Sequence, residues 1–388
     1  ALAAGHIIEC GCQATGGNYS FFKEVPSFDN VGYPIAEIKN DGSFYITKHP
    51  GTGGLVSTGT VTAQLLYEIS APAYLNPDVI AHFDTLNIEE VSKDRVYVSG
   101  CRGSSPTNTH KVCINLAGGY RNGMEFILTG IDIEEKAQII TDALFNSVGG
   151  KEQFDEVSIL LDRTDKKDPN SNEEAMASLR ISVKSKDPDL VGRMFTAKMI
   201  ELALANYPGF FTGGGVRSGG PVLVYWPALI DSRHIEETVH IDGKEINVKP
   251  TNQLDLEETY YQKQPIEIPP PPSGETLNMP LGELFGARSG DKGGCANIGV
   301  WAKSENAFSF LNNFLTVKKI KELMPDISEF EIDRYELPNI LSLNFYIHDI
   351  LEDGVSSNSR KDGQAKSLGE YLRAKYVDIP KSLFEENI

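Results

Sequence analysis

Apolar and polar residues alternate in short runs along much of the chain, a period typical of strands joined by tight turns. Two pairs of runs flank an Asp-Gly dipeptide, at Asp41-Gly42 and Asp242-Gly243, which favours a two-residue hairpin turn. A further turn is expected at Tyr120-Arg121-Asn122-Gly123. The strands predicted in this part of the chain are Ile35–Asn40, Ser43–Thr47, Arg95–Ser99, Lys111–Leu116, Val239–Ile241 and Glu245–Val248.

Other segments repeat apolar residues every three or four positions, which is the period of an amphipathic helix. The longest are Glu134–Ser147 and Asp189–Asn206. Two shorter helices are expected at Gly5–Gln13 and Thr60–Tyr67. Strands and helices therefore mix along residues 1–263, and we predict a larger mixed α/β domain there.

A run of four prolines at 269–272 marks the clearest boundary, because proline donates no ladder hydrogen bond and favours an extended chain. We predict a proline-rich linker at 264–275 and a separate domain at 276–388. The pattern of apolar and polar residues in this second domain predicts the order β-β-α-β-β-α, which is typical of an α+β sandwich with helices on one face of the sheet. The expected elements are Leu281–Arg288, Ala296–Lys303, Ala307–Phe314, Val317–Met324, Phe330–Leu337, Ile340–Ile347 and Lys366–Lys375.

The net charge of the chain limits the kinds of partner that it can bind. Its 54 acidic and 36 basic residues give a net charge of −18, which repels nucleic acid and anionic membranes. No stretch approaches the ~18 consecutive apolar residues of a spanning helix, so no membrane is expected as a partner. Five scattered cysteines favour reduced thiols in the cytoplasm or an organellar lumen. The cysteines are Cys10, Cys12, Cys101, Cys113 and Cys295.

Two glycine-rich segments of the first domain are candidates for binding an anion. Gly16-Gly17 follow a predicted helix and allow a ligand close to the backbone, with the carboxylate of Glu9 nearby for proton transfer. Gly53-Gly54 precede a helix, and their amides, with Lys48 and Thr52, are suited to a phosphate or carboxylate. A glycine helix cap and a plain structural loop remain the alternatives.

A third candidate lies in the second domain, between two predicted strands. The segment 289–294 holds three glycines, more than a hairpin needs, so Gly290 and Gly293 are predicted to line a binding loop. Arg288 and Lys292 could bind an anion, while Asp291 could orient Lys292 or exchange a proton. The alternative is a solvated turn with an exposed Asp–Lys pair.

Two further segments leave alternatives open. Five glycines at 210–220 suggest a lid anchored by Arg217, or a surface loop. His234, Glu236 and His240 could form a two-His, one-carboxylate metal set, but a face beside a hairpin turn is usually wet. We therefore expect no resident metal. No dinucleotide fingerprint occurs either, so no redox cofactor is expected.

Three motifs resemble the AtuA (acyclic terpene utilisation) family: ECGCQATGG at 9–17, KHPGTGGLVS at 48–57 and GARSGDKGGCANIGVWA at 286–302. The resemblance covers essentially the whole chain and implies a ferredoxin-like C-terminal domain. The family carries an RSGDKG-x-x-ANIGV signature in that domain, often with a polar residue where this chain has Cys295. The resemblance also implies an additional α/β domain before residue 9, so an N-terminal α/β chain or domain is expected as a partner in an oligomer.

The resemblance implies a role in the catabolism of acyclic isoprenoids, which proceeds through acyl-CoA thioesters. The expected activity is proton transfer on a small anionic acyl substrate, of hydratase, lyase or isomerase type, with CoA present only as part of that substrate. A non-catalytic accessory or assembly subunit is the alternative. The expected catalytic residues are Glu9, Asp291 and Lys292, and the expected binding residues are Gly16, Gly17, Lys48, Thr52, Gly53, Gly54, Arg288, Gly290 and Gly293.

Overall fold

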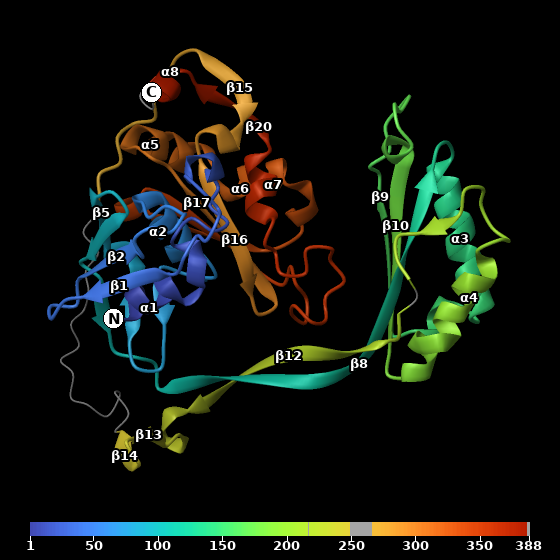
Figure 1. The fold of residues 1–388 in the computed structure, drawn as a ribbon, viewed down its shortest axis with the longest axis horizontal. Helices are drawn as coiled ribbons and strands as arrows, with labels where there is room; N and C mark the ends of the chain where they lie inside the picture. Colours follow the sequence, from blue (N-terminus) through green and yellow to red (C-terminus); the bar gives the residue numbers. More distant parts are fainter. Residues whose placement is uncertain (216, 249–265, 386–388) are drawn as a thin grey trace. The chain divides into compact units, whose positions relative to one another are not determined.

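A computed structural model of the chain describes residues 1–215, 217–248 and 266–385 (Figure 1). The chain forms two compact units. The first comprises Ala1–Cys113, Pro227–Val355 and Asp362–Ile388, and the second comprises Ile114–Trp226 and Ser356–Lys361. Every residue predicted to act in the site belongs to the first unit.

The C-terminal part of the first unit contains an antiparallel four-stranded sheet in the order β16-β17-β19-β18. Two hairpins build it, with two helices between them and a third helix after the second hairpin. The predicted order β-β-α-β-β-α is therefore confirmed. The bounds are β16 (Gly286–Lys292), β17 (Cys295–Trp301), α5 (Glu305–Phe314), α6 (Val317–Leu323), β18 (Ile332–Leu337), β19 (Ser342–Ile347) and α7 (Leu368–Arg373).

The two faces of this sheet pack into different cores, because successive side chains of a strand point to opposite faces. Ile298 and Val300 of β17 join a core with Phe308 of α5 and Ile320 of α6. Trp301, the next residue along β17, belongs instead to a core built by the N-terminal part of the chain. The sheet is thus buried on both sides.

The N-terminal part of the first unit places two helices beside a sheet in the order β1-β2-β6-β5. The predicted strand pairs on either side of Asp41-Gly42 and Asp242-Gly243 both form. The two-residue turn is confirmed only at Asp242-Gly243, where Ile241 pairs with Lys244. At Asp41-Gly42 it is wrong, because the ladder ends at the pair Ile38 and Phe44 and a longer turn joins the strands. The elements here are α1 (Leu2–Glu9), β1 (Pro34–Ile38), β2 (Phe44–Lys48), α2 (Thr58–Leu65), β3 (Ala73–Leu75), β4 (Ile80–His82), β5 (Asn87–Ser92), β6 (Arg95–Ser99), β7 (Arg102–Ser104), β13 (Glu237–Ile241) and β14 (Lys244–Val248). Near the C-terminus, β15 (Thr276–Pro280) pairs with β20 (Tyr376–Pro380), which α8 (Ser382–Glu385) follows.

The second unit packs two helices on a sheet whose longest strand is β8. The turn expected at Tyr120-Arg121-Asn122-Gly123 is wrong, because these residues lie inside β8 and pair with β10. The helix predicted at Asp189–Asn206 begins with a π turn at Leu190–Met194, in which Gly192 leaves helical geometry. The elements are β8 (Thr109–Thr129), α3 (Ile133–Ser147), β9 (Glu156–Asp162), β10 (Met176–Ser185), α4 (Phe195–Leu202), β11 (Phe211–Thr212) and β12 (Gly220–Asp231), of which β8 and β12 each extend by five residues into the first unit.

The compact units do not follow the sequence order, since residues from both ends of the chain share the first unit. The predicted linker at 264–275 begins in residues outside those described, so the boundaries at 263 and 276 stay a prediction. No helix among the described residues has the length and apolar character needed to cross a lipid bilayer. All five cysteines are free thiols.

Candidate active site on strand β16

The predicted loop at 289–294 is mostly strand. β16 continues to Lys292 and pairs residue by residue with β17, so that only Gly293-Gly294 form the turn. The expectation of a glycine-rich binding loop is therefore wrong, because the backbone of Gly290 lies in the sheet opposite Asn297. A Cβ at Gly290 would lie 2.6 Å from Tyr67 Cε2, so this glycine allows Tyr67 to pack flat on the strand.

Two buried asparagines attach the segment that follows α2 to the sheet. Asn297 donates through Nδ2 to the carbonyl of Leu66 (2.6 Å), and its Oδ1 accepts the backbone N–H of Glu68 (2.9 Å). Asn344 accepts from Asn297 (2.8 Å) and donates to the carbonyl of Ser70 (2.9 Å). Since buried amides must be hydrogen-bonded, this pairing fixes the backbone at Glu68. Glu68 itself has a left-handed φ of 56°, which only a well-supported segment holds.

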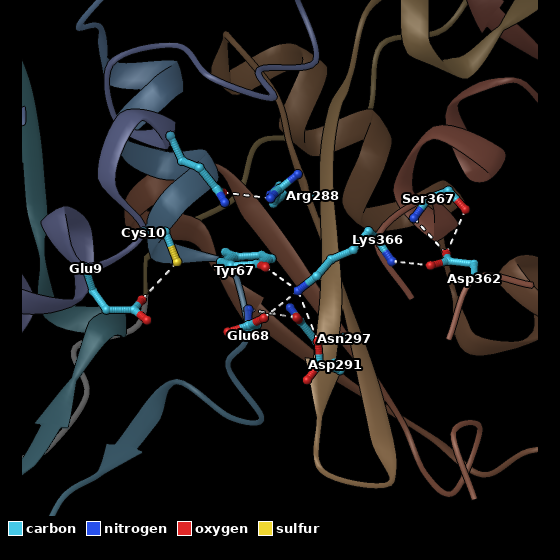
Figure 2. Close-up of polar contacts among 11 residues, drawn as sticks. Glu9, Cys10, Tyr67, Glu68, Arg288, Asp291, Asn297, Asp362, Lys366 and Ser367 are labelled. Carbon is cyan, nitrogen blue, oxygen red and sulfur yellow. Dashed lines mark hydrogen bonds and ion pairs between the residues drawn. The ribbon is translucent and has the colours of Figure 1, made fainter. Parts of the chain in front are cut away.

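Lys366 lies at the centre of the charged cluster that results (Figure 2). Its Nζ is 2.6 Å from Glu68 Oε1 and 3.0 Å from Asp291 Oδ1, and it also donates to the hydroxyl of Tyr67. Burial lowers the pKa of Lys366, but the hydrogen bonds with these three acceptors outweigh burial and raise its pKa overall. Lys366 is therefore a fixed cation that joins two carboxylates.

Asp362 holds Lys366 in place from within the same turn. Its Oδ1 accepts the backbone N–H of Lys366 (2.9 Å), and its Oδ2 accepts both the N–H and the hydroxyl of Ser367. Although burial raises the pKa of Asp362, these hydrogen bonds lower it overall. The turn before α7 is thus built to present one lysine side chain.

Arg288 and Lys292 are the two cations of strand β16. Unlike Lys366, neither forms an ion pair with a carboxylate of the cluster. Burial lowers the pKa of each. Arg288 stacks on Tyr67 (4.3 Å to the ring centroid) and donates to Gln13 Oε1 (2.7 Å), while its buried Nε has no hydrogen-bond partner in the described parts of the chain. Among the described residues, Lys292 forms no ion pair or hydrogen bond and lies 5.4 Å from the ring centroid of Tyr74. Two partly buried cations therefore lack a carboxylate partner within the described part of the chain.

The end of α1 contributes the remaining ionisable groups. Cys10 donates to the exposed carboxylate of Glu9 (3.0 Å), and burial, followed by this hydrogen bond, raises the pKa of the Cys10 thiol to about 11. His6 packs against Tyr74 and Phe83, and its buried Nε2 has no hydrogen-bond partner among the described residues. Burial, and then the charge of Lys292, lower the pKa of His6 to about 4. This side of the cluster holds a neutral imidazole, a neutral thiol and an acidic group.

The two glycine-rich segments of the N-terminal part do not bring their amides to this cluster. The N–H groups of Gly16 and Gly17 bond to the carbonyls of Gln13 and Cys12. Those of Thr52, Gly53 and Gly54 bond to the carbonyls of His49, Asn30 and Ser27. Lys48 donates to the carbonyl of Thr52 (2.9 Å) and lies 3.6 Å from Asp94. The prediction that these amides form an anion site is wrong, because the chain's own carbonyls already occupy them.

Four residues of the cluster are not predicted by the sequence: Tyr67, Glu68, Asn297 and Lys366. Asn297 lies within the third motif, but an asparagine beside charged residues gives no signal of its own. Tyr67, Glu68 and Lys366 have no local pattern, since they meet the strand only through the fold. The candidate metal set also fails to form: His234 lies in the turn before β13, and the described residues group other side chains instead.

The fold and the cluster define a two-part protein in which a ferredoxin-like sheet holds an N-terminal segment against charged side chains. Residues 1–241 match the family described as acyclic terpene utilisation family protein AtuA, and residues 279–378 match its AtuA ferredoxin-like domain. The chain belongs to the AtuA family. This membership indicates a role in acyclic terpene utilisation. No curated protein and no solved structure shows a significant match.

Proposed function

We propose that the chain is an enzyme of acyclic isoprenoid breakdown that acts by proton transfer on a small anionic acyl substrate, a free acid or its CoA thioester. One observation carries the proposal: Lys292 is a partly buried cation that has no carboxylate partner among the residues that the structure describes. A cation held this way is costly unless an anion completes it, and such groups gather at functional sites.

The anionic head of the substrate is proposed to bind Lys292, with Arg288 as a second cation. Their neighbours support this role, because Tyr67 and Tyr74 supply aromatic faces beside the charges. An aromatic wall suits a branched hydrocarbon chain better than a purely polar surface does. The remaining binding residues expected from the sequence, at Gly16-Gly17 and at 48–54, have no part in this proposal, since their amides bond within the chain.

Glu9 is the better candidate for the group that exchanges a proton. Its carboxylate is exposed, and its hydrogen bond comes from a thiol whose raised pKa keeps the proton on sulfur. Asp291 is less available, because it forms an ion pair with Lys366. In this scheme Asp291 positions Lys366, and Glu9 removes or returns a proton next to the acyl carbonyl, the step common to hydration, elimination and isomerisation.

Replacing Lys292 by methionine tests the proposal, because methionine keeps an apolar stem against Tyr74 and removes only the charge. We expect acyclic isoprenoid acids, or their CoA thioesters, to bind about tenfold more weakly or worse, since a hydrogen bond to a charged group contributes about 1.5–3 kcal/mol. Binding is measured by calorimetry on the intact chain, and the melting temperature should stay within a few degrees.

Lys318→Met is the matched control, because Lys318 lies on α6 with 88% of its side chain exposed. It should leave binding unchanged. A panel of free acids and thioesters that binds neither the native chain nor the control would overturn the proposal and favour an accessory subunit. Equal binding by the native chain and Lys292→Met would remove Lys292 from the site.

A further inference from the structure

A second cluster of ionisable groups lies toward the opposite edge of the same sheet, where β18 begins and β19 ends. It consists of Glu331, Asp333 and His348, each of which turns one possible ligand atom toward the others. All three atoms lie within 4.8 Å of one another. Because β16 and β18 are the two edges of the sheet, this group is separate from the candidate active site.

The spacing of these atoms suits a shared divalent ion. His348 Nε2 and Asp333 Oδ2 are 2.9 Å apart. Two ligands that each lie ~2.1 Å from a zinc ion are about 3.0–3.4 Å from one another at octahedral or tetrahedral angles. An ion could therefore replace the hydrogen between these atoms with only a small outward shift, and Glu331 lies close enough to supply a third ligand.

The backbone and neighbouring rings hold these side chains in place. The N–H of His348 donates to the carbonyl of Glu331 (3.0 Å), which keeps the two residues opposite each other at the end of the ladder. Tyr335 donates its hydroxyl to Asp333 (3.3 Å), and the ring of Tyr346 meets the imidazole of His348 edge-on at 4.9 Å. Groups that orient the ligands in this way are usual around metal sites.

The charge of the cluster favours a cation. Neither Glu331 nor Asp333 forms an ion pair with a lysine or arginine among the residues that the structure describes. Two carboxylates and an imidazole therefore meet without a balancing positive charge, on a chain whose net charge is −18. One histidine with two carboxylates is a ligand set that zinc and similar transition metals accept, with open positions left for water.

We propose that Glu331, Asp333 and His348 bind one divalent transition-metal ion, with zinc as the best fit to this ligand set. The site is partly exposed and has three protein ligands, so water completes the coordination of the ion. It is independent of the proposed function, which uses no metal. Sequence alone does not reveal it, because the ligands are spaced as 331, 333 and 348 and meet only through strand pairing.

Calorimetric titration of the chelator-treated chain, purified without a histidine tag, with Zn²⁺ tests the proposal. We expect one ion per chain and at least tenfold weaker binding in His348→Gln and in Glu331→Gln. Glu331 is exposed, so its substitution should not disturb folding. His240→Gln on β13 is the control and should bind Zn²⁺ as the native chain does.

Titration with Co²⁺ separates this site from the free thiols of Cys10 and Cys12. A site of nitrogen and oxygen ligands gives only weak visible bands, whereas a thiolate adds an intense near-ultraviolet band. The weak bands should appear in the native chain and disappear in His348→Gln. A thiolate band, or binding that neither variant weakens, would overturn the proposal.

Discussion

At the scale of single residues, a buried histidine couples folding to pH. His6 is only 7% exposed and packs against two aromatic rings, and none of the described residues forms a hydrogen bond with its Nε2. Burial holds its pKa at about 4 in the folded chain, against an ordinary value of 6.5. Below pH 6.5 His6 therefore binds a proton in the unfolded chain but stays neutral in the folded chain until the pH approaches 4. Stability from this group is present above pH 6.5 and is lost as pH falls toward 4.

His6→Phe should remove this part of the pH dependence while keeping an aromatic ring against Tyr74 and Phe83. In the native chain the group changes the free energy of unfolding by about 3 kcal/mol between pH 6.5 and 4. Urea unfolding at several pH values measures the slope for each chain. An identical slope in the variant would show that His6 takes up a proton in the folded state.

The sequence predicts some residues of the candidate active site and not others. Arg288, Asp291 and Lys292 were selected from their motif, and all three lie in the charged cluster. Glu68 and Lys366 could not be selected, because the property that matters is their hydrogen bonding to each other across 298 positions. Pairings of this kind have no local signal.

At the scale of elements, β16 has two roles: it is an edge strand of the sheet, and it carries the charged side chains of the candidate active site. Its glycine at 290 lies under Tyr67 and Glu68, where any side chain would collide with both. The absence of a side chain at Gly290 therefore lets the segment after α2 approach the sheet closely. The next residues of the strand, Asp291 and Lys292, carry the charges.

Gly290→Ala should destabilise the chain by about 1–3 kcal/mol, because the added Cβ would lie 2.6 Å from the ring of Tyr67 and 2.9 Å from Glu68 Cγ. Gly5→Ala is the matched control. Its Cβ would meet open space on α1, so a gain of about 0.5–1 kcal/mol is expected from helix propensity. Urea unfolding measures both. A loss in Gly5→Ala as large as in Gly290→Ala would refute the packing argument.

Element prediction succeeded where the period was clear and failed where a strand was long or charged. The two Asp-Gly hairpins and the helices α3, α5 and α6 were found from pattern alone. The sequence predicts a turn at Tyr120–Gly123, inside the continuous strand β8, because the dipeptide Asn-Gly is typical of turns. Both residues nevertheless pair with β10. β16 was ended too early for a related reason, since glycine and charge within a strand resemble a loop.

At the scale of the whole molecule, the first unit joins distant parts of the chain through polar contacts. Ser20 exchanges hydrogen bonds with the backbone of Ala287, and Asn339 donates to the carbonyls of Phe83 and Leu86. Lys303 pairs with Glu24. Each contact joins the first 113 residues to the ferredoxin-like part, so the two are expected to fold together.

Residues 1–248 and 266–388, produced as separate polypeptides in one cell, should associate and copurify. The second fragment alone would expose Trp301 and the buried amides of Asn297 and Asn344, so it should melt at a lower temperature than the pair. Asn297→Ala should weaken the association. Fragments that each melt at the temperature of the intact chain would contradict a shared fold.

The charged cluster takes Glu9 and Glu68 from the stretch matched at 1–241, and Lys292 and Lys366 from the stretch matched at 279–378. Neither stretch holds the full set of charges, so the cluster forms only when both are present. Any gene that encodes only one of them would have to recruit the other as a companion polypeptide before the same chemistry could appear.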